Sequence, residues 1–147
     1  MWRPVLLMVQ WLIAITAIAG GIALVAGPRI SLGITPPPEN LAGSPFSSYV
    51  WPGIILAVVV GGTHVWALIL LRRRRRGALA VASTAAFGVL IWVFVQVLII
   101  PFSVLQVTYF ALGLIELALV LLMLDVFHGR LGPSRRSRGL GSTRVSD

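Results

Sequence analysis

The chain has 147 residues, of which 58% are hydrophobic and 11% charged, and its formal net charge is +8. A soluble globular domain carries about 25% charged residues, so this composition excludes an ordinary soluble domain and predicts an integral membrane protein. The chain contains no cysteine, which excludes disulfides, thiolate metal sites and thiol redox chemistry.

The first apolar segment covers residues 4–26 and follows Trp2 and Arg3. It exceeds the roughly 7–15 apolar residues of a signal peptide, and the large Leu24 stands where a cleavage site wants a small residue. The sequence therefore predicts an uncleaved membrane-spanning helix, with a cleaved signal peptide as the alternative. Arg3 places the amino terminus on the cytoplasmic side.

An outer loop is predicted over residues 27–51, where Gly27 and Pro28 end the first helix. Three consecutive prolines, 36–38, predict an extended polyproline stretch. The aromatic residues at the end of the loop are typical of the membrane–water interface. Pro52 is expected to be the first residue of the second helix, where its missing N–H costs nothing.

The second segment, residues 52–71, ends at five consecutive arginines that cannot lie in hydrocarbon. Loops rich in arginine stay on the cytoplasmic side, and this turn is expected to contact anionic lipid headgroups. No aromatic residues alternate with these arginines, which argues against nucleic acid as a partner. The five residues are Arg72, Arg73, Arg74, Arg75 and Arg76.

Two further apolar segments cover residues 78–100 and 104–127, and a polar tail, 129–147, is predicted to be disordered and cytoplasmic. The short connections predict consecutive antiparallel neighbours. The predicted fold is therefore all-α: one domain, residues 1–128, forming a four-helix antiparallel transmembrane bundle in the cell membrane, with both termini cytoplasmic.

The loop resembles that of small four-helix membrane proteins of actinobacteria, which share a Gly-Ser/Thr-Pro-Phe-x-x-Tyr/Phe-x-x-Pro-Gly motif, a basic turn after the second helix, and a glutamine in each of the last two helices. The resemblance implies the fold and the membrane location but no activity. Arginine as the only basic residue type also suits a high-GC actinobacterium. The matching residues in the loop motif are Gly43, Ser44, Pro45, Phe46, Tyr49, Pro52 and Gly53.

Glu116 lies near the middle of the fourth segment, a depth at which ionisable groups are rare and usually face a bundle interior. At 1.5 Å per residue, Glu116 and His64 both lie about 18 Å from the start of their segments, so a Glu–His pair is possible. Three interpretations stay open: an internal contact that stabilises the bundle, a proton- or ion-coupled site, and contact with a partner helix.

Gln96 and Gln106 flank the predicted outer turn, and a hydrogen bond between them is the first interpretation. A ligand site formed by this pair with Tyr109 is the alternative. Gln10 and Thr16 on the first segment are likewise expected to form hydrogen bonds between helices. Small residues recur every four positions, which predicts close approach of helix backbones; two such pairs are Ala17 with Gly21 and Ala57 with Gly61.

Asp125 and His128 are expected to pair with the nearby arginines, and no third ligand for a metal accompanies them. The sequence predicts no metal, cofactor or familiar catalytic motif.

The sequence favours a non-enzymatic accessory or scaffold subunit of a membrane or envelope assembly, with another membrane protein or a second copy as partner. The alternative is a small proton- or ion-coupled transporter or channel using Glu116 and His64. A lipid-modifying enzyme is disfavoured because Glu39 is the only acid of the outer loop.

Overall fold

The computed structural model describes residues 2–27 and 37–124, and all the regular structure in this part of the chain is helical. Val50 to Arg72 form one continuous span made of three labelled pieces, so four helices are long and apolar enough to cross a membrane. This confirms the predicted all-α fold with four spans. The elements are α1 (Arg3–Ala26), η1 (Pro38–Leu41), α2 (Val50–Ile54), η2 (Ile55–Gly61), α3 (Gly62–Arg72), α4 (Ala78–Ile99) and α5 (Val104–Met123).

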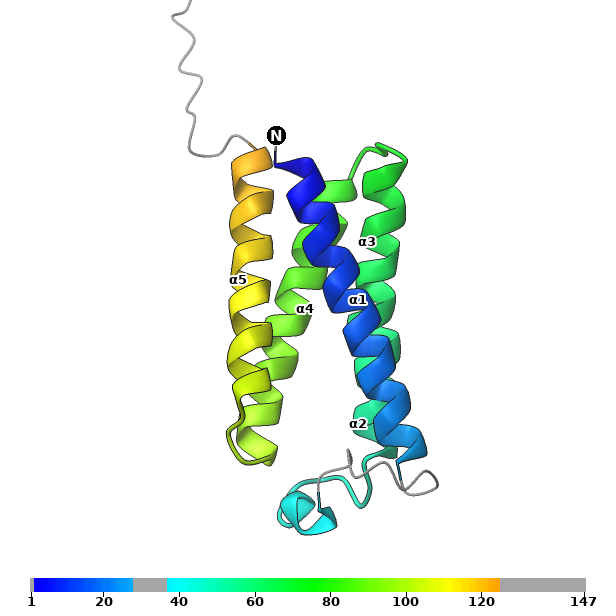
Figure 1. Cartoon of the computed structure of the whole chain (residues 1–147), viewed down its shortest axis with the longest axis vertical. Helices are drawn as coiled ribbons and strands as arrows, with labels where there is room; N and C mark the ends of the chain where they lie inside the picture. The colour runs from blue at the N-terminus through cyan, green and yellow to red at the C-terminus, as the bar shows by residue number, and fades with distance from the viewer. Residues whose placement is uncertain (1, 28–36, 125–147) are drawn as a thin grey trace, which may run out of the picture.

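The four spans pack side by side around a shared core (Figure 1). α1 contacts the second span and α5, while α4 contacts α3 and α5. The amino terminus, the α3–α4 turn and the end of α5 lie together at the top of Figure 1, and the 37–49 loop and the α4–α5 turn lie at the bottom. We call these the arginine end and the loop end.

The helix limits lie close to those predicted, with differences at the second and fourth spans. The second span begins at Val50, so Pro52 is its third residue and not its first. Pro52 still lies in the first turn, where a backbone N–H has no helical partner to lose. α5 ends at Met123. Asp125, His128, the predicted tail and Pro36 of the proline stretch lie outside the described residues. Within that stretch, Pro37 has the expected extended backbone, but Pro38 already begins η1.

A π-helical stretch, η2, interrupts the second span and was not predicted. Its i→i+5 hydrogen bonds give a wider turn, with fewer degrees of rotation per residue than an α-helix. Residues spaced four apart therefore stay closer to one face of the helix than they would in a regular α-helix. Gly53, Ala57 and Gly61 all face α1 in this way.

α1 and the second span approach so closely that there is no room for a side chain at Gly21. A Cβ there would lie 2.5 Å from the Gly53 carbonyl oxygen and 2.6 Å from the Ala57 Cβ. The converse holds at Gly53, where a Cβ would lie 2.7 Å from the Gly21 carbonyl oxygen. The predicted close approach at the pairs of small residues is therefore present.

We expect Gly21→Ala to lower the free energy of unfolding by about 1–3 kcal/mol, because the added methyl group overpacks a backbone contact that cannot yield. Gly88→Ala is the matched control, since a Cβ at Gly88 meets no atom within 4 Å. The control should leave stability unchanged or slightly higher, as alanine favours helix. Thermal denaturation in mild detergent measures both. Equal midpoints for the two variants would contradict the close packing.

The outward faces of the bundle carry large apolar side chains, as a lipid-facing surface requires. Trp11 and Trp66 are 57% and 62% exposed on these faces. Trp92 differs, because it is half-buried on the inner side of α4 and packs against a buried apolar cluster near the loop end.

Candidate functional site

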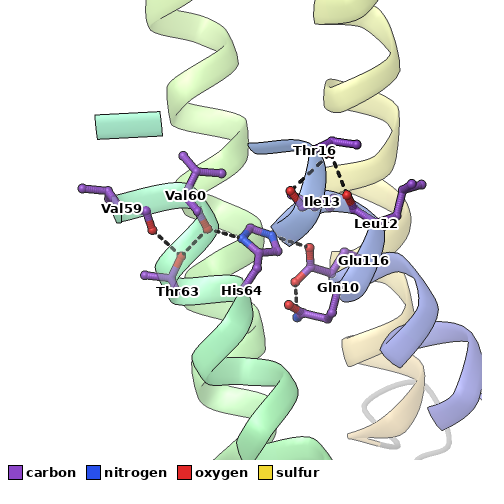
Figure 2. Close-up of polar contacts among 9 residues, drawn as sticks. All are labelled: Gln10, Leu12, Ile13, Thr16, Val59, Val60, Thr63, His64 and Glu116. Carbon is purple, nitrogen blue, oxygen red and sulfur yellow. Dashed lines mark hydrogen bonds and ion pairs between the residues drawn. The ribbon is translucent and has the colours of Figure 1, made fainter. Parts of the chain in front are cut away.

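Three polar side chains from three different spans meet in the middle of the bundle (Figure 2). Glu116 of α5 lies between His64 of α3 and Gln10 of α1, and all three are fully buried. The His64 Nε2 is 3.1 Å from the Glu116 Oε2, and the Gln10 Nε2 donates to the Glu116 Oε1 at 2.5 Å. We call Gln10, His64 and Glu116 the polar triad.

The hydrogen bonds of the polar triad fix how many protons it holds. The His64 Nδ1 lies 2.6 Å from the carbonyl oxygen of Val60, which can only accept, so Nδ1 carries a hydrogen. The contact between Nε2 and the Glu116 Oε2 then needs one further proton, on either the imidazole or the carboxyl group. Both arrangements give the His64–Glu116 pair zero net charge, which avoids the large cost of an isolated buried charge.

Apolar clusters separate the polar triad from both ends of the bundle. On the loop side lies a cluster of Ile13, Ala17, Val60 and Val89. On the arginine side lies a second cluster, which consists of Leu6, Ala67, Leu71, Ala78, Ala82, Ala85, Leu119 and Val120. The nearby threonines, Thr16 and Thr63, donate their hydroxyls back to carbonyls of their own helices (Figure 2). The triad is therefore an enclosed polar centre within an apolar core.

The Glu116–His64 contact agrees with the equal depth estimated from the sequence. Gln106 and Gly113 are buried on α5 together with Glu116. Gln10 makes an interhelical hydrogen bond, as expected, but its partner Glu116 was not predicted. The sequence signal of Gln10 was a lone amide within an apolar span, but nothing in the sequence shows that α1 lies beside α5. The Gln10 Oε1 is buried and has no hydrogen-bond partner among the described residues.

The expected hydrogen bond between Gln96 and Gln106 does not form in the described part of the chain. The Gln106 Oε1 instead accepts from the backbone N–H of Ser103, the N-cap residue of α5, at 3.0 Å. Ser-x-x-Gln ahead of an apolar run is a capping-box signature, so the sequence did contain this signal. Gln96, Gln106 and Tyr109 do come together, as part of the lining of one cavity at the loop end.

The motif of the outer loop is explained by local geometry. Gly43 has φ +87°, a conformation that favours glycine. The Ser44 Oγ accepts from the Phe46 N–H at 3.2 Å, and the Tyr49 hydroxyl donates to the Pro37 carbonyl at 3.0 Å. Burial raises the pKa of the Tyr49 phenol, so it remains a donor at neutral pH. Gly53, as described above, permits the close contact with α1.

The arginine turn is exposed over its whole length, residues 72–76. Arg3 joins it from the start of α1, because its guanidinium donates to the Leu71 carbonyl and lies 3.4 Å from the Arg72 carbonyl oxygen. These carbonyls are at the carboxyl end of α3, where a helix leaves acceptors unpaired and favours positive charge. Arg3 therefore ties the start of α1 to the end of the second span.

Comparisons of the chain with protein-family models, with curated proteins and with solved structures give no match. The resemblance carried by the outer-loop motif stays a prediction, and so does the actinobacterial origin. Any function must be argued from the polar triad, the arginine end and the loop end.

Proposed function

We propose that this chain is a non-enzymatic accessory or scaffold subunit of a membrane or envelope assembly. The observation that carries the proposal is that the polar triad is enclosed by apolar residues on both sides. Membrane-buried ionisable residues pair with one another, and a transport path also needs access from the two ends of the bundle. Here Glu116 contacts both His64 and Gln10, and apolar clusters lie on either side. This arrangement suits a bundle that holds its shape and is recognised from outside.

Glu116 itself is not the contact with a partner helix under this proposal, because its side chain is fully buried within the chain. The partner, another membrane protein or a second copy, would contact the outward faces of the helices or the loop end. Trp51 and Phe102 at the loop end are 63% and 74% exposed, and exposed aromatic residues are frequent anchors of protein interfaces.

At the arginine end the proposed partner is anionic lipid of the cell membrane, on its cytoplasmic side. A groove of about 400 Å³ is lined by apolar residues of α1 and α3 together with Arg72. An acyl chain suits such a lining, and the guanidinium suits a phosphate group. Exposed charges on the adjoining turn add attraction of about 1 kcal/mol each.

The test is native mass spectrometry of the tagged chain, purified in mild detergent from the membrane in which it naturally occurs. We expect a defined complex with another membrane protein or with a second copy at fixed stoichiometry. The matched control is Glu116→Gln, which keeps the outer surface unchanged and should retain the same complex. Recovery of the chain as a single copy without a protein partner would contradict the proposal.

The second candidate is a proton- or ion-coupled transporter or channel. It is favoured by one observation, the 3.1 Å contact between His64 and Glu116, across which a proton can move. It would require the apolar cluster on each side of the polar triad to open in turn. Substitutions that preserve the bundle but remove the titratable proton distinguish the two candidates, as described in the Discussion.

A further inference from the structure

A cavity of about 510 Å³ lies at the loop end, apart from the polar triad. Its walls come from α1, the second span, α4 and α5, and residues of the loop also line it. The apolar cluster that contains Val60 and Val89 lies between this cavity and the triad, and Val89 belongs to both the cluster and the cavity wall. The volume is within the range of about 300–1,000 Å³ of small-molecule sites in proteins.

Gln106 presents a fixed and unpaired hydrogen-bond donor at this cavity. Its side chain is 3% exposed, and its oxygen is held by the Ser103 N–H. That bond orients the amide, because a flip would place the NH₂ group against another donor. The Gln106 Nε2 is buried and has no hydrogen-bond partner among the described residues.

Trp92 presents a second unpaired donor from α4. Its indole Nε1 is buried, and it too finds no acceptor in the described part of the chain. An indole nitrogen can only donate. Two buried donors of one cavity wall are thus without acceptors, which costs free energy until an acceptor pairs with them.

The rest of the lining defines the kind of molecule that would supply the acceptors. Most of the wall is aliphatic or aromatic, and no charged side chain lines it within residues 2–27 and 37–124. An anionic head would therefore meet no compensating charge there. A neutral oxygen, such as an ester or quinone carbonyl, accepts hydrogen bonds without that cost.

We propose that this cavity binds a lipid-like molecule that has an apolar body and an uncharged carbonyl head, with Gln106 and Trp92 donating to the carbonyl oxygens. This site goes beyond the proposed accessory function and does not depend on it. Two sources share this chemistry, glycerolipid esters and lipid quinones.

The test measures equilibrium binding to the full chain in mild detergent at constant micelle concentration. The probes are dioctanoylglycerol, a decyl-substituted benzoquinone and, as the anionic comparison, decanoate. Gln106→Leu removes the amide donor together with the oxygen that accepts from the Ser103 N–H, while Trp92→Phe removes only the indole N–H. Thr108→Val is the control, because Thr108 is exposed on the same helix and bonds to its own backbone.

We expect at least one neutral probe to bind, with affinity lowered about 3- to 10-fold by each donor substitution and unchanged by the control. Saturable binding of dioctanoylglycerol would identify a glycerolipid site, and preference for the benzoquinone would identify a quinone site. The proposal is overturned if neither neutral probe binds, if decanoate binds best, or if both donor variants bind as tightly as the natural chain.

Discussion

Glu116→Ala is expected to lower the free energy of unfolding by about 2–4 kcal/mol. The substitution removes both hydrogen bonds of the carboxyl group and leaves the donor of Gln10 and the ring nitrogen of His64 buried without partners. It also opens a cavity between α1, α3 and α5. The protein in mild detergent is titrated with a denaturing detergent, and the loss of helix is followed by circular dichroism to measure the change in the free energy of unfolding.

Glu116→Gln is the matched control for this prediction. The glutamine oxygen can accept from Gln10, and its NH₂ group can donate to the His64 Nε2 in the tautomer that the Val60 carbonyl already selects. We therefore expect a loss of no more than about 1 kcal/mol. If the alanine and glutamine variants were equally stable, the polar triad would not hold the helices together.

A single cysteine at Ser47 should react with a membrane-impermeant maleimide in intact spheroplasts, whereas one at Arg75 should react only after permeabilisation. Both residues are exposed, at the loop end and the arginine end respectively. The expected difference is all or none, because arginine-rich loops are in general retained on the cytoplasmic side. The natural chain has no cysteine, so each variant carries one thiol.

The unsubstituted chain, which cannot be labelled, is the background control for that experiment. Ser48→Cys, one residue further along the exposed loop, should repeat the Ser47 result. Labelling of Arg75→Cys in intact spheroplasts, with protection of Ser47→Cys, would reverse the proposed orientation.

The sequence was sufficient for the spans and for one contact of the site. Apolar runs of about 20 residues have few alternatives to a membrane helix, and this is why the limits at residues 26 and 78 agree with the structure. The Glu116–His64 contact could be anticipated because depth follows from helical rise alone.

What the sequence did not reveal depends on which helices are neighbours. Gln10 completes the polar triad only because α1 lies against both α3 and α5. Gln106 was paired with Gln96 because both flank one turn, yet a local backbone N–H competes better for its oxygen. The π-helical stretch lies where the second span packs closely against α1, and no residue type in η2 indicates it in advance.

The central claim is that the polar triad stabilises the bundle and does not carry protons. Its most direct test is proton flux into liposomes that contain the natural chain or Glu116→Gln, under an imposed pH gradient and membrane potential. We predict that both fluxes equal that of empty liposomes. A flux through the natural chain that Glu116→Gln abolishes would contradict the claim and establish the triad as a proton path.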